Sequence, residues 1–256
     1  MKEKTEAFER LLNIMDDLRE KCPWDKKQTI ESLRHLTIEE TYELSDAILK
    51  SNNEELKKEL GDILLHIVFY ARIASETQAF NITDVINSLC DKLIFRHPHI
   101  YGDVTVKNEE DVKQNWEKLK QKEKGGNTSV LSGVPNSMPA LLKAYRIQEK
   151  ARAVGFDWDK PEQVFEKVRE EIEELNTEVK NGTISKIEDE FGDVLFALIN
   201  YGRFINVNAE DALERTNKKF TKRFNYMEQK IKEQGKQLAD CTLAEMDVYW
   251  NEAKKL

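Results

Sequence analysis

Apolar residues recur along this chain at the spacing of amphipathic helices, and no segment shows the alternation that is typical of a strand. The stretch from Ile63 to Phe69 is apolar on nearly every side, as in a buried helix. The pattern therefore predicts an all-α protein. The helices expected in the first half cover residues 5–20, 37–50, a segment from about 54, a segment from 83 to 97, and 108–123.

Short polar motifs indicate where some of these helices begin. Thr37 followed by Glu40 has the form of a capping box, so we expect a helix to open or to be re-capped at Thr37. Thr83 can cap a further helix, and Thr242 with Glu245 can cap the last helix of the chain.

The second half of the chain repeats the order of the first. Its expected helices cover 140–153, a segment from 161 to the turn at Asn181-Gly182, then 188–204, 209–233 and a last one after 242. Between the halves, residues 125–139 have the only linker-like composition, rich in Gly, Pro and Ser. We therefore expect two tandem helical-bundle domains, over residues 1–126 and 139–256, joined by a linker over 127–138.

One acidic signature occurs twice with the same internal spacing, at an offset of 131 residues. Each copy has two acids three residues apart and, after a turn, the sequence Glu-x-Gly-Asp. Carboxylates three apart share a helix face, and two antiparallel helices joined at the turn would place all four acids level. The two sets are Glu40, Glu43, Glu59 and Asp62 in the first half and Glu171, Glu174, Glu190 and Asp193 in the second.

Four converging carboxylates would repel one another unless a cation neutralised them, so each set predicts a metal site. Only oxygen ligands are present, which favours Mg²⁺, with Mn²⁺ as a substitute. The sequence has no Glu-x-x-His motif, which excludes the di-iron carboxylate bundle. The acids that lie beside these two sets are better explained as part of a solvated helix face than as metal ligands. These acids are Glu39, Glu170, Glu173, Glu188 and Asp189.

Composition indicates which partners and which cellular location to expect. Forty basic and 48 acidic residues give a net charge of −8, which argues against nucleic acid as the main partner. The three cysteines are scattered, which fits reduced thiols and not a disulfide framework. The charged N-terminus lacks the apolar core of a signal peptide, and no apolar run is long enough to span a membrane. We therefore expect a cytoplasmic protein that does not bind membranes.

The doubled acidic signature, Cys22-Pro23-Trp24-Asp25 and the Arg-His-Pro-His sequence at 96–99 together resemble the MazG family of nucleoside triphosphate pyrophosphohydrolases, in the all-α NTP pyrophosphatase superfamily. The likeness covers nearly the whole chain. It implies a homodimer of two tandem MazG-like domains that hydrolyses NTPs or dNTPs to the monophosphate and pyrophosphate with Mg²⁺. The catalytic and metal-binding residues that it implies are Glu171, Glu174, Glu190 and Asp193, with Glu40, Glu43, Glu59 and Asp62 as first-domain equivalents.

The resemblance also implies that Lys186, Lys219 and Arg223 bind the phosphates or the nucleotide and that Trp250 lies near the base. Lys219 and Arg223 are four residues apart, so they share a helix face and could hold a polyphosphate together. The two copies differ at one informative place: Glu55 occupies the position that corresponds to Lys186. An acid there would repel a triphosphate, so we predict that the C-terminal site is the main catalytic one.

The implied reaction is attack of an activated water on the α-phosphorus, with pyrophosphate as the leaving group. Two alternatives stay open. A narrower enzyme of the superfamily, such as a dUTPase or a phosphoribosyl-ATP pyrophosphohydrolase, would share the same acids. A helical interaction module with a vestigial metal site would show no Mg²⁺-dependent hydrolysis.

Overall fold

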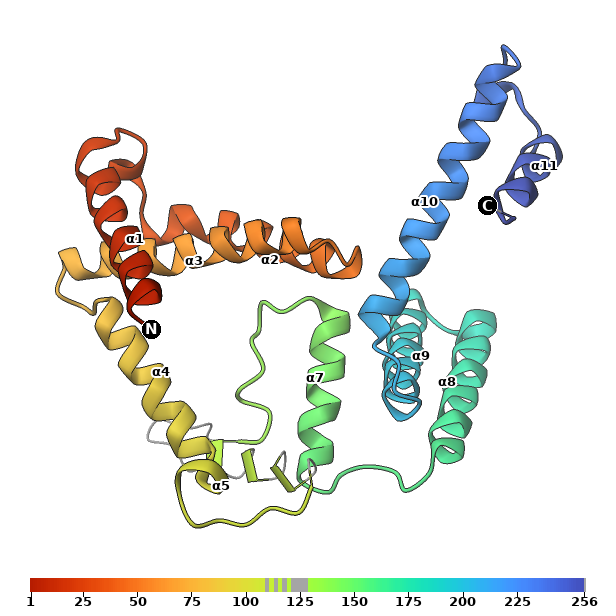
Figure 1. The fold of residues 1–256 in the computed structure, drawn as a ribbon. Coiled ribbons are helices and arrows are strands. Elements are labelled where there is room, and N and C mark those ends of the chain that lie inside the picture. Colours follow the sequence, from red (N-terminus) through yellow and green to blue (C-terminus); the bar gives the residue numbers. More distant parts are fainter. Residues whose placement is uncertain (109–110, 113–114, 117–118, 121–128, 256) are drawn as a thin grey trace. The chain divides into compact units, whose positions relative to one another are not determined.

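The described residues of the computed structural model fold mainly into helices (Figure 1). The structure describes every residue except 109–110, 113–114, 117–118, 121–128 and 256. No strand occurs among the residues so described, which confirms the all-α prediction. The chain divides into two compact units, Met1–Glu109 and Glu110–Leu256, which we call unit 1 and unit 2.

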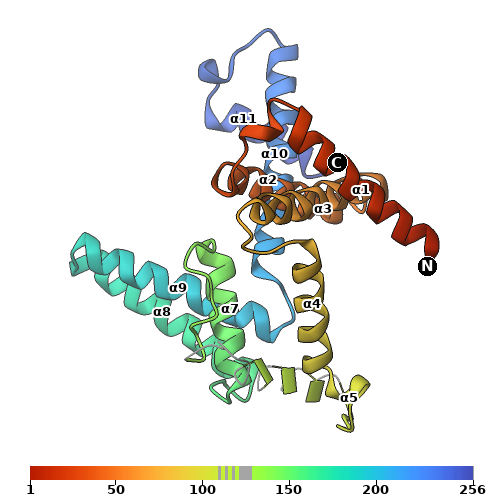
Figure 2. The same cartoon turned by 90° about the vertical axis from the view of Figure 1, so that its left-hand side faces the viewer.

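Unit 1 is organised around a hairpin of two long helices. Its helices are α1 (Lys2–Lys21), α2 (Ile30–Leu49), α3 (Asn53–Glu76), α4 (Ile82–Arg96) and α5 (Pro98–Tyr101), with a 3-10 turn at Asp25–Lys27. In the α2/α3 turn, Ser51 has a φ of 54°, and Asn52 caps α3 by accepting from the backbone N–H groups of Glu54 and Glu55. Figures 1 and 2 show α2 and α3 lying side by side.

The core of unit 1 lies where α1 crosses the hairpin. Met15, Leu33, Val68 and Phe69 are each at most 2% exposed, and apolar side chains from α1, α2 and α3 surround them. Full burial of a side chain of this size stabilises a fold by roughly 1.5–3 kcal/mol. These apolar contacts hold α1 against the end of the α2/α3 hairpin that is farther from the turn.

Two expected helix starts in unit 1 are wrong. Helix α2 begins at Ile30, where Thr29 and Ser32 form a reciprocal capping box, so Thr37 lies inside the helix. Helix α4 is capped by Asn81 and not by Thr83. The spacing of Thr37 and Glu40 matches a capping box, but the Thr37 side chain does not act as a cap. Its hydroxyl donates to the backbone carbonyl of Leu33, one helical turn earlier.

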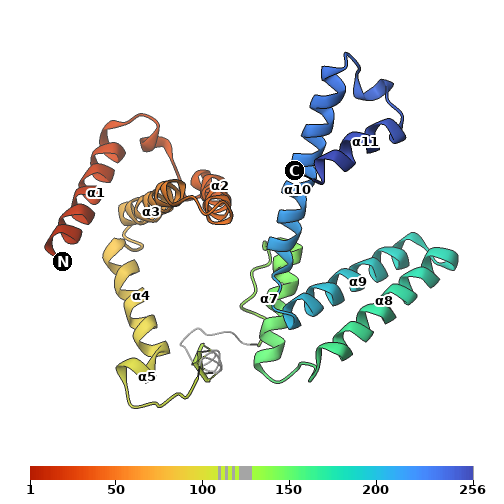
Figure 3. The same cartoon turned by 45° about the vertical axis from the view of Figure 1, so that its right-hand side comes forward.

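Unit 2 contains the second hairpin. Its helices are α7 (Ala140–Ala153), α8 (Pro161–Asn181), α9 (Ile184–Phe204), α10 (Ala209–Glu233) and α11 (Leu243–Ala253), with a 3-10 turn at Leu238–Asp240. Figure 3 shows α8 beside α9 and α11 beside α10, and α7 packs on α9. The expected capping box of Thr242 and Glu245 is confirmed at the start of α11. The most buried apolar side chains of unit 2 belong to Val164, Val168, Ile199, Met227 and Ile231.

Each unit uses one arginine to fasten the segment that precedes its hairpin. In unit 2 the Arg203 guanidinium, at the end of α9, donates to both carboxylate oxygens of Asp157, one of them at 2.9 Å. In unit 1 Arg19 donates to the backbone carbonyl of Gln28 at 3.0 Å and to the Glu76 carboxylate at 2.8 Å. These bonds fix how the chain enters α8 and α2.

The expected domain bounds stay a proposal. The linker expected over 127–138 and the helix expected over 108–123 both include residues outside the described part of the chain. Within the described part, no helix has the length and apolar character that crossing a bilayer requires.

Candidate functional site

Three carboxyl groups of unit 2 meet across the α8/α9 hairpin. Glu171 and Glu174 lie one turn apart on α8, and Glu190 lies on α9, which returns alongside it (Figure 3). One carboxylate oxygen from each can be chosen so that all lie within 4.8 Å of one another. Glu171 is buried, Glu190 is half-buried and Glu174 is exposed, so the group opens to solvent on one side. We call it cluster 2.

Lys167 partly neutralises cluster 2 from within α8. Its ammonium group lies 2.7 Å from carboxylate oxygens of both Glu170 and Glu171, and these bonds raise the pKa of Lys167. The pKa of Glu174 is also raised, by loss of hydration and by the negative charge of Glu171, with a smaller contribution from Glu190 and an opposing one from Lys167. One lysine therefore leaves cluster 2 with excess negative charge, as a cation-binding group requires.

Unit 1 holds the equivalent group, which we call cluster 1. Glu40 and Glu43 on α2 and Glu59 on α3 also place one carboxylate oxygen each within 4.8 Å of the others. Lys58 contacts the Oε1 atom of Glu59 at 3.0 Å. Burial raises the pKa of Glu40, and so do the charges of Asp62, Glu43 and Glu59, while Lys58 opposes them.

The fourth acid of each predicted set stands apart from these groups. Neither cluster 1 nor cluster 2 includes Asp62 or Asp193. Asp62 lies near enough to act on the pKa of Glu40 and pairs with Lys58 at 3.8 Å, whereas Asp193 is exposed. Their role as metal ligands stays a prediction.

The predicted substrate-binding residues fall into two places. Lys186 lies in the first turn of α9, is 65% exposed, and contacts Glu178 at 3.9 Å across the hairpin. Lys219 and Arg223 lie on α10, which begins beyond the end of α9 opposite to the hairpin turn. Trp250, from α11, packs against Phe220 of α10 with ring centroids 5.0 Å apart. Lys219, Arg223 and Trp250 therefore lie on α10 and α11, which are helices other than those that carry cluster 2.

Sequence reasoning missed the two lysines that pair with the clusters. Lys167 precedes Glu171 by four residues and Lys58 precedes Asp62 by four, which is the spacing of helical ion pairs. That signal was present in the sequence, but it is common on charged helices. The two lysines do not occupy equivalent positions, because Leu36 corresponds to Lys167 and Asp189 to Lys58. Aligning the two copies therefore did not reveal them.

A polar network inside unit 1 also escaped prediction. The Thr37 hydroxyl lies 2.8 Å from Nδ1 of His66 and 2.7 Å from the Tyr70 hydroxyl, so it joins α2 to α3. Burial lowers the pKa of His66, and the Asp62 charge opposes this only in part. His66 therefore acts as a neutral, hydrogen-bonded core residue.

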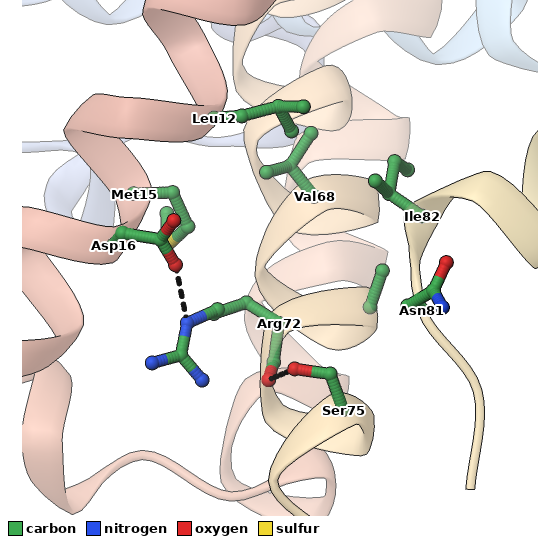
Figure 4. A pocket seen from close by; sticks show the side chains of 9 residues that line it. Leu12, Met15, Asp16, Val68, Arg72, Ser75, Asn81 and Ile82 are labelled. Carbon is green, nitrogen blue, oxygen red and sulfur yellow. Dashed lines mark hydrogen bonds and ion pairs between the residues drawn. The ribbon is translucent and has the colours of Figure 1, made fainter. Parts of the chain in front are cut away.

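A pocket of about 130 Å³ lies elsewhere in unit 1, between α1, the second half of α3 and the start of α4 (Figure 4). Its walls are mainly apolar and include Leu12, Val68 and Ile82. At its edge, Arg72 pairs with Asp16. None of the cluster 1 acids lines this pocket, so it is separate from the carboxylate site.

The chain matches the MazG nucleotide pyrophosphohydrolase domain twice, over residues 28–101 and over residues 159–227. It is 48% identical over 257 residues to a nucleoside triphosphate pyrophosphohydrolase/pyrophosphatase MazG from Thermotoga maritima, covering 99% of this chain and 98% of the relative. It is 39% identical over 255 residues to a nucleoside triphosphate pyrophosphohydrolase from Escherichia coli K12, covering 97% of each. A crystal structure of a mazG-related protein from Thermotoga maritima matches 44% of this chain and 98% of its own, with 27% identity and a TM-score of 0.40.

The two matched segments contain the two hairpins and both carboxylate clusters. The tandem arrangement expected from the doubled acidic signature is therefore confirmed. The chain belongs to the MazG nucleotide pyrophosphohydrolase family.

Proposed function

We propose that this protein hydrolyses nucleoside triphosphates to the nucleoside monophosphate and pyrophosphate. The observation that carries the proposal is cluster 2, in which three carboxylate oxygens converge within 4.8 Å inside a matched family segment. The relatives from Thermotoga maritima and Escherichia coli carry this activity in their names, and they align over nearly the whole chain. In the reaction, water supplies the new oxygen on the α-phosphorus, and the bond from that phosphorus to the pyrophosphate oxygen breaks.

The residues of cluster 2 fit a hard divalent cation, and we propose Mg²⁺, with Mn²⁺ as a substitute. All three side chains offer carboxylate oxygens, which such ions prefer. The single positive charge of Lys167 does not balance the negative charge of three carboxylates. A bound divalent cation supplies charge neutralisation for the phosphates and lowers the pKa of water. Glu171, Glu174 and Glu190 would hold it, with Asp193 at the exposed side.

Lys186, Lys219, Arg223 and Trp250 are the proposed substrate contacts. Lys186 projects from the first turn of α9, one helical turn before Glu190, so it can attract a phosphate toward cluster 2. Lys219 and Arg223 are one turn apart on α10, and the Trp250 ring lies on the neighbouring helix. Cation and aromatic groups together suit a nucleotide, whose phosphates are anionic and whose base has a flat face.

The test is a substrate panel with the full-length protein. We expect monophosphate and pyrophosphate in equal amounts from the eight common NTPs and dNTPs, and no release without a divalent cation. With dUTP added to the panel, turnover of dUTP alone would indicate the narrower superfamily enzyme. Absence of cation-dependent hydrolysis across the panel would contradict the proposal and favour an interaction module.

We propose that the protein is a homodimer. Each hairpin exposes an apolar stripe at the same positions: Leu60, Leu64 and Ile67 on α3 are 39–51% exposed, and Phe191, Leu195 and Leu198 on α9 are 45–55% exposed. Such stripes are typical of helix faces that pack against another helix. Light scattering should give twice the chain mass of 29.9 kDa, and a monomer mass would contradict the dimer.

The cytoplasm is the proposed location of the protein.

A further inference from the structure

The pocket of unit 1 between α1, α3 and the start of α4 has the features of a ligand site (Figure 4). We propose that it binds a free α-amino acid with a branched aliphatic side chain, such as leucine. The aliphatic side chain would fill the pocket, and the ammonium and carboxylate groups would meet Asp16 and Arg72 at its edge. The site uses none of the acids of cluster 1 or cluster 2, and it goes beyond the proposed hydrolysis.

The first argument is the size and lining of the pocket. Its volume is about 130 Å³, and an apolar cavity of about 150 Å³ can take up benzene, so a group of about four to six carbon atoms fits. Pockets for larger molecules measure roughly 300 Å³ or more, which excludes a nucleotide. The apolar walls come from Leu12, Met15, Val68, Ala71 and Ile82. An aliphatic side chain would gain both burial and packing contacts against these walls.

The second argument is the pair of opposite charges at the edge of the pocket. Arg72 donates from Nε to Oδ1 of Asp16, and Figure 4 shows the two charged groups side by side. In a free amino acid the ammonium and carboxylate groups are bonded to the same carbon, so they need an acid and a base that lie next to each other. The Asp16 side chain is 57% exposed, so a ligand can reach this edge from solvent.

Both charged groups keep hydrogen-bonding capacity for a ligand. Arg72 also donates from Nη1 to Oε1 of Glu76 at 3.1 Å, so its bonds to the two acids use two of the five N–H groups of the guanidinium. Among the residues that the structure describes, no acceptor bonds Nη2 of Arg72 and no donor bonds Oδ2 of Asp16. A ligand carboxylate at Nη2 and a ligand ammonium at Oδ2 would therefore add bonds without breaking any.

The ion pairs at this edge favour a ligand with no net charge. Arg19 pairs with Glu76 at 2.8 Å, and Glu76 in turn pairs with Arg72, which pairs with Asp16. Two arginines and two acids thus balance each other in one series of ion pairs. A phosphate or a metal ion would add an unmatched charge to this series, whereas an amino acid brings one charge of each sign.

The experiment is a calorimetric titration of the full-length protein, without nucleotide, with L-leucine and with analogues that each lack one group. We expect about one equivalent of leucine per chain and a dissociation constant on the order of 0.1–1 mM. Leucinamide lacks the carboxylate and 4-methylpentanoate lacks the ammonium group, so each should bind about ten- to a hundredfold more weakly. Glycine keeps both charges but has no side chain, and it should bind on the order of a hundredfold more weakly.

Two variants test whether leucine binds in this pocket. Asp16→Asn removes the charge that meets the ammonium group and should weaken leucine binding about ten- to a hundredfold. Its matched control is Asp17→Asn, which removes the neighbouring exposed acid of α1 and should leave the affinity unchanged. Ala71→Leu fills the pocket from α3, so it should abolish binding and keep or raise the midpoint of thermal unfolding. If Ala71→Leu lowered that midpoint, Asp16→Asn and the analogues would still decide the site.

Three results would overturn the proposal. One is the absence of binding at about 10 mM leucine. Another is equal affinity for leucine and for leucinamide or 4-methylpentanoate, because one of the two charged contacts would then play no part. The third is a leucine affinity that Asp16→Asn leaves unchanged. Since none of these measurements uses a nucleotide, they decide this site whether or not the protein releases pyrophosphate.

Discussion

Glu190→Gln is expected to lower the rate of pyrophosphate release by on the order of a hundredfold or more while the helices stay folded. Glu190 is the only member of cluster 2 that α9 contributes, so its loss leaves ligands on α8 alone. Gln keeps the size of the side chain but removes a negative charge, and cation affinity depends on the number of charged ligands. The measurement is pyrophosphate release with saturating Mg²⁺ and NTP.

Folding is not expected to suffer from this change. The charge of Glu190 helps to raise the pKa of Glu174, which is a sign of repulsion within cluster 2. Removing it should therefore leave the metal-free protein no less stable, as circular dichroism during heating can show. Glu188→Gln, on an exposed position of the same helix, is the matched control. Normal turnover by Glu190→Gln would disprove the role of cluster 2.

Lys186→Glu should lower kcat/KM for NTPs by about a hundredfold, most of it through a higher KM. A hydrogen bond to a charged group contributes roughly 1.5–3 kcal/mol, which corresponds to about ten- to a hundredfold, and the reversed charge adds repulsion. The Lys186 side chain is 65% exposed and its contact with Glu178 is long, at 3.9 Å, so folding depends little on it. Steady-state kinetics with ATP at fixed Mg²⁺ gives both constants.

Lys180→Glu is the control for this variant. Lys180 lies at the exposed end of α8, close to the same hairpin turn, and the substitution changes the net charge equally. If both variants raised KM alike, the effect would come from the general field of the hairpin end and not from a contact with Lys186. That result would also remove the main reason for assigning catalysis to unit 2 and not to unit 1.

Much of the fold could be predicted because helices leave a local signal. The 3.6-residue period, the turn at Asn181-Gly182 and the capping box at Thr242 are all properties of neighbouring residues. Thr37 shows the limit of that reasoning. Its sequence context fits a helix start, yet the real start at Ile30 comes earlier, and the Thr37 hydroxyl bonds His66 and Tyr70 on another helix. A partner so far along the chain is invisible to a local pattern.

The sequence by itself determined that the chain is helical and doubled, and it identified two sets of acids with equal spacing, because both follow from periodicity and repetition. Only the tertiary structure decided which acids converge: three carboxylates in each hairpin, without Asp62 or Asp193. It also decided that a different lysine pairs with each cluster and that Oε2 of Glu59 is buried without a hydrogen-bond partner among the described residues. Distance, burial and pairing across a helix interface depend on how side chains of two helices interlock, and spacing along one chain does not specify this.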